Sequence, residues 1–244
     1  MARLARIVVP GVPHHVIQRG NRRLDVFFND EDRVAYLTLL QRACQRYGVN
    51  IWAYCLMRSH VHLIAVPERE DALARGLSDA HVRYARRINF REGRRGHLWQ
   101  SRFGSSVLDE RYLIAAVRYV ERNPVRAEIV RLPWEYRWSS AKWHVGEVRV
   151  DPLVTDDALL REMISDWREY LSAEGHEGEV EAIRRETPVS RPLGSQDFLR
   201  RLERRFSRRL MRGRSGDVLE NWWLSPIELM GCKHGGLSTG DGTT

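Results

Sequence analysis

Two histidines spaced two residues apart, His60 and His62, lie in the β-rich run HVHLIAV. Side chains two apart in a strand point to the same side, about 7 Å apart along the chain, so both imidazoles can reach one ion. The intervening Val61 then faces a core. Two imidazoles suit Mn²⁺ and leave positions open for the oxygen ligands that Mg²⁺ prefers. A pair of surface histidines on a half-exposed strand is the alternative interpretation.

A tyrosine and an asparagine one helical turn apart form the second chemical feature. The segment ERYLIAAVRYVERN, residues 110–123, has an apolar stripe typical of a helix packed on a sheet. Tyr119 and Asn123 share one side of this helix, and Tyr112 lies two turns before Tyr119. A phenol beside a metal ion is a workable nucleophile for phosphoryl transfer, and Asn123 could be a third metal ligand. The alternatives are a tyrosine at the edge of a core and an asparagine that ends a helix before proline.

The other histidines offer no second chelating pair. His14 and His15 are neighbours in a predicted strand, so they point to opposite faces and cannot chelate one ion together. The remaining histidines have no partner at a useful spacing: His81, His97, His144, His176 and His234.

The elements that must position these residues follow a β-α-β-β-α-β order and then a third helix. This order predicts an α+β, ferredoxin-like fold: a four-stranded antiparallel sheet with two helices on one face. The third helix, which bears the tyrosine, must then lie on the free face or edge of the sheet. The expected strands are 14–19, 49–57, 60–66 and 99–108, and the expected helices are 29–47, 71–90 and 109–123.

The rest of the chain differs in composition. We expect residues 1–148 to form the catalytic domain, 149–212 a basic helical extension and 213–244 a disordered tail. Within the extension we expect one helix over 151–174 and another over 195–211. Predicted core residues of the extension are Leu153, Leu159, Leu160, Ile164, Trp167, Tyr170, Phe198, Leu202, Phe206 and Leu210.

The charge indicates a polyanionic partner. Among 244 residues the net charge is +8, and all but two of the 40 basic side chains are arginines, whose planar fork suits phosphate. The three cysteines lie far apart and predict neither a disulfide framework nor a zinc site. No apolar run is long enough for a membrane span or a signal peptide, so we expect a cytoplasmic, nucleoid-associated protein.

Basic and aromatic side chains are the candidate nucleic-acid contacts. Arginines should grip phosphates without regard to sequence, and aromatic rings should stack on bases. For the arginines at 195–212, a clamp on DNA and a solvated helix face are both open. The candidates are Arg19, Arg22, Arg23, Arg83, Arg87, Arg94, Arg95, Trp99, Arg102, Arg201 and Arg205.

Several motifs in order give the chain a family resemblance. PHHVIQRGNRR, CLMRSHVHLIAVP, GHLWQSRF, AAVRYVERNPVRAEIV and EYRWSSA together resemble the REP-associated tyrosine transposases, which are single-tyrosine HUH endonucleases. The resemblance covers residues 12–146, with a weaker match at 190–199. Arg58-Ser59 stands where the family usually has Pro-Asn, in the turn and not at a predicted ligand.

The resemblance implies a mechanism and a substrate. Tyr119 would attack a phosphate of single-stranded DNA that folds into a hairpin, forming a 5′-phosphotyrosine and releasing a 3′-OH. His60 and His62 would hold one Mg²⁺ or Mn²⁺ ion, with Asn123 one turn after the nucleophile. A 3′-OH attacking the phosphotyrosine would reseal the strand. The active form would be a monomer or a homodimer. The alternative is a catalytically silent regulator that binds hairpin DNA or RNA.

Overall fold

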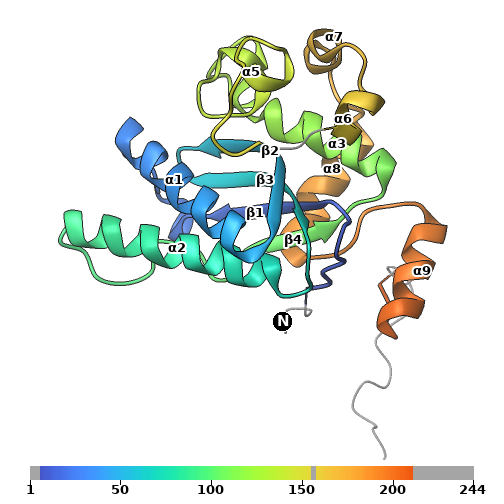
Figure 1. Ribbon diagram of the computed structural model, residues 1–244, viewed down its shortest axis with the longest axis horizontal. Helices are drawn as coiled ribbons and strands as arrows, with labels where there is room; N and C mark the ends of the chain where they lie inside the picture. The colour runs from blue at the N-terminus through green and yellow to red at the C-terminus, as the bar shows by residue number, and fades with distance from the viewer. Residues whose placement is uncertain (1–5, 155–157, 211–244) are drawn as a thin grey trace, which may run out of the picture. The chain divides into compact units, whose positions relative to one another are not determined.

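The computed structural model describes residues 6–154 and 158–210. Its centre is a four-stranded antiparallel sheet in the order β2-β3-β1-β4, the order of a ferredoxin-like fold (Figure 1). The predicted fold class is therefore confirmed. The strands are β1 (His14–Arg19), β2 (Val49–Met57), β3 (His60–Pro67) and β4 (Gly104–Val107).

Two long helices, α1 (Asp30–Tyr47) and α2 (Ala72–Arg91), cover one face of the sheet (Figure 1). The Asn29 side chain caps α1 by accepting a hydrogen bond from the Asp32 amide, at 2.9 Å. Gly48 ends the helix with a φ of 69°, a left-handed conformation that glycine adopts without strain. Both predicted boundaries of this helix are confirmed.

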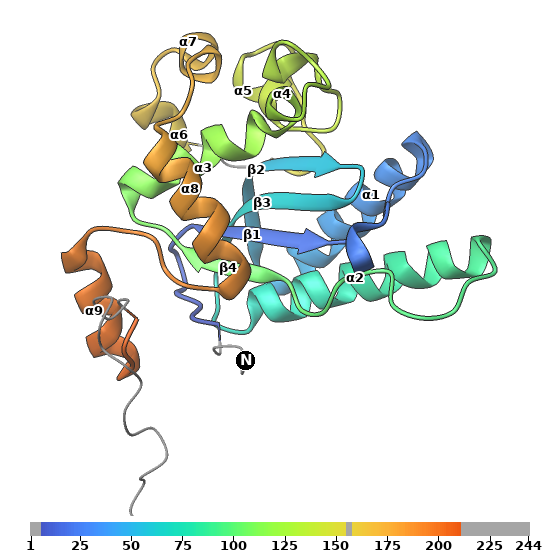
Figure 2. The ribbon, with the colours of Figure 1, turned by 180° about the vertical axis from the view of Figure 1, so that it is seen from behind.

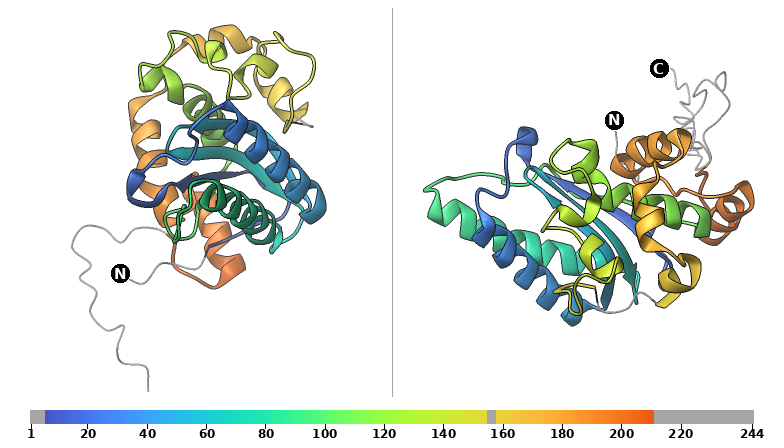
Figure 3. Two further views of the ribbon diagram at one scale, coloured as in Figure 1. Left: turned by 90° about the vertical axis from the view of Figure 1, so that its left-hand side faces the viewer. Right: turned by 90° about the horizontal axis from the view of Figure 1, so that it is seen from above.

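The other face carries α3 (Glu110–Glu121), as expected for the helix with the tyrosine. Figure 2 shows this side, where α8 (Glu177–Glu186) packs against α3, and the left panel of Figure 3 shows the layers on both sides. Leu113, Val117 and Val120 of α3 are buried in one cluster with Ile64 of β3. The sheet is thus packed on both faces.

The end of the tyrosine helix differs from the prediction. α3 stops at Glu121, and a separate turn, α4 (Asn123–Arg126), carries the chain past Pro124. Proline is tolerated in the first turn of a helix because that amide has no intrahelical partner anyway. The short α4 therefore places Arg126 beneath α3, where its guanidinium donates to the Tyr119 carbonyl at 2.6 Å.

The fourth strand is shorter than predicted. β4 begins at Gly104, and Trp99 makes only an isolated bridge with Gly20. Ser101 between them has a φ of 49°, which breaks the extended conformation. A long strand over 99–108 was therefore wrong at its N-terminal half.

The extension contains more breaks than expected. The helix predicted over 151–174 is replaced by α6 (Ala158–Met163) and α7 (Trp167–Ser172), and Asp166 caps α7 through the Glu169 amide at 2.9 Å. Leu159 is 42% exposed, so its assignment to the core was wrong, whereas the other predicted core positions of this segment are buried. The remaining short elements are η1 (Asn21–Arg23), η2 (Pro133–Glu135), α5 (Ala141–His144) and η3 (Thr187–Val189).

The basic amphipathic helix is α9 (Gln196–Phe206), capped by Ser195. Leu202 and Leu210 are buried with Ile7 and Val107, and Phe198 and Phe206 pack against the same cluster. The predicted apolar stripe is confirmed.

The described residues form one compact unit, in which residues from the first two predicted segments pack together. The tail predicted from residue 213 lies outside the described residues. Along the described part of the chain, no helix combines the length and apolarity needed to cross a membrane.

Candidate active site

His60 and His62 lie on one face of β3, as the alternation predicts. Their ring centroids are 5.1 Å apart with the planes nearly perpendicular. Val61, Leu63 and Ala65 face the opposite way and are buried in the cluster under α1 and α2. The core on one side of the strand therefore holds the histidine pair in place on the other.

Tyr119 reaches this histidine pair from α3. Its ring centroid is 5.5 Å from that of His62, in an edge-to-face arrangement, and the tyrosine is 7% exposed. No contact joins Tyr112 to either histidine within residues 6–154 and 158–210. The structure thus brings Tyr119, and not Tyr112, to the candidate metal ligands.

Asn123 completes the predicted group. Its side chain lies near enough to His60 to raise the pKa of that imidazole by hydrogen bonding, although burial dominates and lowers the pKa to about 4. The Asn123 Nδ2 atom is buried and has no hydrogen-bond partner in the described structure. The two ends of an amide are interchangeable by rotation, so this site can offer a donor to a phosphate oxygen or a carbonyl oxygen to a cation.

The histidines of the site are neutral at physiological pH. Burial, followed by the charges of neighbouring His15 and His60, holds the pKa of His62 well below its ordinary value. Arg19 and Arg126 add to the effect on both His60 and His62. A neutral imidazole keeps the lone pair that a metal ion needs.

Arg126 is a member of the site that the sequence did not reveal. Its guanidinium lies 4.0 Å above the centroid of the Tyr119 ring. Burial lowers the pKa of Arg126 to about 10, and no ion pair joins it to a carboxylate among the described residues. A half-buried cation that has no carboxylate partner among the described residues and lies beside a candidate nucleophile fits an incoming phosphate. Only the helical turn after Pro124, which the sequence pattern did not predict, places it here.

His15 is the second member that sequence reasoning missed. Its ring plane is nearly parallel to that of His62, with the centroids 5.1 Å apart, and its Nε2 faces His62 Nδ1 at 2.9 Å. Antiparallel pairing of β1 with β3 sets Ile17 opposite His62 and His15 opposite Ile64, which puts His15 on the face of the candidate ligands. The rejection of His14 and His15 as a mutual pair holds, because they face opposite ways. Only the pairing register of β1 with β3 shows that His15 lies beside His62, and the sequence alone does not give that register.

The donor set fits one divalent ion that also takes ligands from a substrate. Among the described residues, no three His, Cys, Asp or Glu side chains converge to hold a metal. Two imidazoles and one amide oxygen leave coordination positions for phosphate and water. His60, His62 and Asn123 are the residues that would hold such an ion.

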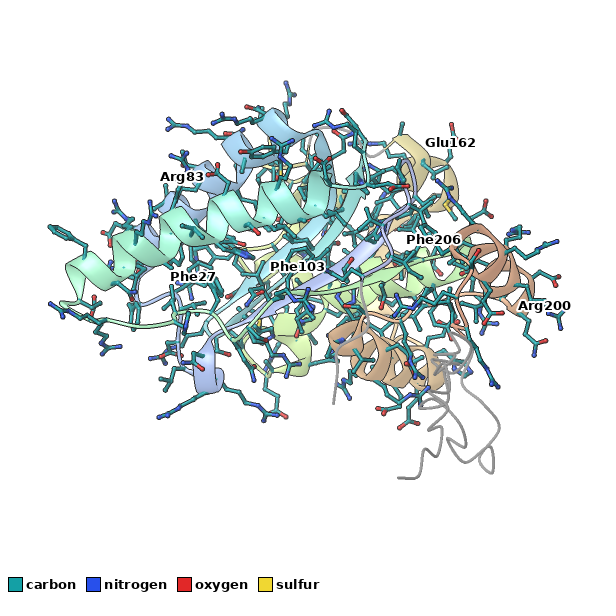
Figure 4. The ribbon with its side chains drawn as sticks, turned by 90° about the horizontal axis from the view of Figure 1, so that it is seen from below. Phe27, Arg83, Phe103, Glu162, Arg200 and Phe206 are labelled. Atoms are coloured by element: carbon teal, nitrogen blue, oxygen red, sulfur yellow. The ribbon has the colours of Figure 1, made fainter. Side chains whose placement is uncertain are left out.

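The predicted DNA contacts lie in several places. Arg19 sits opposite His60 in the sheet, and η1 follows with exposed Arg22 and Arg23. Arg83 lies on α2, across the sheet from Tyr119, and forms an ion pair with Asp79 at 2.7 Å. In Figure 4, Arg83 and Arg200 lie at opposite ends of the view, on the outer sides of α2 and α9. The other arginines predicted to contact DNA are also exposed: Arg87, Arg94, Arg95, Arg102, Arg201 and Arg205.

Trp99 lies in the core and is not an open stacking platform. Its indole N–H donates to the His81 carbonyl at 3.2 Å, and its ring centroid is 4.7 Å from that of His81. The aromatic cluster of Tyr36, Tyr84 and Trp99 stabilises the packing of α2 on the first strand's end.

Comparisons with known proteins find similarity in sequence and in fold. Residues 9–123 match a family model described as "Transposase IS200 like". No curated protein matches the sequence. Among solved structures, a REP-associated tyrosine transposase bound to a REP hairpin is similar over 64% of this chain and 93% of its own, with 17% identity and a TM-score of 0.53. A putative transposase from Deinococcus radiodurans is similar over 52% of this chain and 92% of its own, with 19% identity and a TM-score of 0.35. The first likeness shows a shared fold.

Proposed function

We propose that this chain, whose residues 9–123 match the family of IS200-like transposases, is a metal-dependent endonuclease and transesterase. It cuts and rejoins single-stranded DNA at palindromic repeats that fold into hairpins. The observation that carries the proposal is the packing of Tyr119 directly against His62, with the half-buried His60 and the buried Asn123 in the same group. A hairpin substrate is supported by the ligand of the structural neighbour.

Each residue has a part in the first step. The Tyr119 oxygen attacks the phosphorus, loses its proton and forms a 5′-phosphotyrosine, while the bond to the 3′ oxygen breaks and that oxygen gains a proton. Arg126 lies over the tyrosine ring, where its charge stabilises the negative charge that develops. His60, His62 and Asn123 would hold a divalent ion, which would supply positive charge to the phosphate oxygens when bound. Reversal with a new 3′-OH rejoins the strand.

The arginines supply affinity for the phosphate backbone. Arg19 ends the strand beside the histidine pair, and Arg22 and Arg23 follow it, so these three are the nearest candidates for contact with the cleaved DNA strand. The exposed face of α9 would bind a hairpin stem through Arg201 and Arg205. The active form is a monomer or a homodimer.

A covalent adduct tests the proposal. Labelled hairpin DNA with flanking single strands is incubated with the full chain and Mn²⁺, and adducts are separated on a denaturing gel. We expect an adduct with wild type and with Tyr112→Phe, and none with Tyr119→Phe. EDTA and His60→Ala should also abolish it.

The outcomes separate the two functions. An adduct in Tyr119→Phe would show that another residue is the nucleophile. DNA binding without any adduct in wild type would identify the catalytically silent hairpin-binding regulator instead. Cleavage that survives EDTA would remove the metal role of His60 and His62.

A further inference from the structure

Three side chains from distant parts of the sequence form a hydrogen-bonded row that ends at the candidate metal site. Thr187 Oγ1 lies 2.8 Å from His15 Nδ1, and His15 Nε2 lies 2.9 Å from His62 Nδ1. All three residues are at most 1% exposed. Water therefore cannot substitute for any partner in the row, and each group depends on the next for its hydrogen bond.

The row extends the site into the C-terminal extension. Thr187 begins η3, which lies beside β4 and β1. A side chain at Gly104 of β4 would place its Cβ 2.4 Å from the Thr187 carbonyl oxygen, so only glycine lets this backbone approach. Ser105 donates its amide to the Ser190 hydroxyl, and the Leu193 amide bonds the Val107 carbonyl at 2.8 Å. The segment 187–193 is therefore fixed along the edge strand.

The direction of the row decides which nitrogen of His62 is available. If His62 Nδ1 carries the proton and donates to His15 Nε2, then His62 Nε2 keeps its lone pair for a metal ion. His15 must then carry its proton on Nδ1 and donate to Thr187. In the reverse direction His62 Nε2 carries a proton and cannot bind an ion.

We propose that His15 is a positioning residue for the metal site and that Thr187, from the extension, holds His15 in the state that leaves His62 Nε2 free for the ion. This inference rests on the proposed function, because it assumes that His62 is a metal ligand. Metal-bound histidines commonly donate their other ring N–H to a partner that fixes their orientation, and loss of the partner weakens metal binding about 10- to 100-fold.

His15 acts through His62 and is not itself a ligand. The nitrogen of His15 nearest the site already points at His62 Nδ1, and its other nitrogen points at Thr187. No lone pair of His15 remains for an ion. The two ring planes are only 7° apart, which suits the N–H···N hydrogen bond between His15 and His62.

The first test is the protonation of the two rings in the metal-free protein, read by ¹⁵N–¹H NMR of histidine-labelled full chain. We expect the proton on Nδ1 of both His15 and His62. A proton on Nε2 of His62 would overturn the inference.

The second test is the affinity for Mn²⁺ without DNA, measured by the loss of the free-ion EPR signal. Thr187→Val keeps the shape but removes the acceptor, and His15→Phe keeps a ring but removes both nitrogens. We expect about 10-fold weaker Mn²⁺ binding for each of these two variants, and a loss of the same size for Gly104→Ala. Thr187→Ser and His15→Gln retain an acceptor, so we expect a smaller loss for them. Thr38→Val, on the outer side of α1, is the matched control and should bind as wild type.

Failure of the inference and failure of the proposed function give different results. If wild type binds Mn²⁺ and His60→Ala does not, but Thr187→Val and His15→Phe bind as wild type, the metal site stands and the positioning role is wrong. If wild type itself binds no Mn²⁺, the metal site is wrong and the inference falls with it. Thermal unfolding of each variant confirms that it is folded.

Discussion

Replacing Arg126 tests whether the site is built to stabilise negative charge at Tyr119. The guanidinium lies 4.0 Å above the ring centroid, which places it about 5 Å from the phenolic oxygen by simple geometry. With an effective dielectric constant of about 20, the attraction between unit charges at that distance is roughly 3 kcal/mol. Loss of this attraction in the transition state corresponds to about a 100-fold slower reaction.

The assay compares Arg126→Gln with Arg126→Lys in single-turnover cleavage of a labelled hairpin. Both variants disturb the hydrogen bond from Arg126 to the Tyr119 carbonyl, but only glutamine removes the charge. We expect about 100-fold slower cleavage for Arg126→Gln and a clearly smaller loss for Arg126→Lys. Thermal unfolding checks that the buried replacement leaves the chain folded.

Two results would refute this reasoning. Equal rates for the glutamine and lysine variants would mean that the charge of Arg126 does not act on the reaction. A loss of hairpin affinity with an unchanged cleavage rate at saturating DNA would assign Arg126 to binding.

Three further predictions concern stability, binding and the ion. Burial lowers the pKa of His81 to about 3, so the folded state binds fewer protons than the unfolded one, and this stabilisation is lost as pH falls from 6.5 towards 3. Urea unfolding over that pH range measures the effect. His81→Gln should reduce the slope of the unfolding free energy against pH by up to about 1.4 kcal/mol per pH unit. The control Tyr36→Phe removes only the hydrogen-bond partner of His81, so it should shift the curve without changing its slope. Replacing Arg22 and Arg23 with glutamine should reduce the slope of log affinity for single-stranded DNA against log salt by about 1.4, since each phosphate contact contributes about 0.7, and an unchanged slope in a titration would remove both from the interface. Asn123→Ala should weaken Mn²⁺ binding at least about 10-fold, and Asn123→Asp, which keeps an oxygen, should not; equal affinities by EPR would exclude Asn123 as a ligand.

Local patterns were sufficient for much of this fold. The caps at Asn29 and Gly48 fix the first helix, and the alternation around His60 and His62 fixes which way each residue of β3 faces. These features depend on neighbours in sequence, so a single chain shows them directly. To predict the contact between Tyr119 and His62, one further inference was needed: that the third helix packs on the free face of the sheet.

Long-range contacts explain what the sequence did not show. His15 joins the site through strand register and through Thr187, which lies 172 residues further along the chain. The first half of the strand predicted over 99–108 is lost at Ser101, whose positive φ no residue pattern demanded. Leu159 fits an apolar helical face in sequence, but α6 is too short and is turned so that this side chain is exposed.

The charges of the site predict that binding of a metal ion and binding of DNA depend on each other. Within the described residues, no carboxylate bonds to His60, His62, Tyr119 or Arg126, so a divalent ion bound there would face neutral ligands and a nearby guanidinium. The phosphate of the substrate is then the group that offsets both positive charges. Binding of the ion and binding of DNA should each strengthen the other, because coupling between two sites is reciprocal. If His62 binds the ion, the site would hold its full set of charges only when a DNA strand is in place, and the row from Thr187 to His62 would keep this candidate ligand oriented until then.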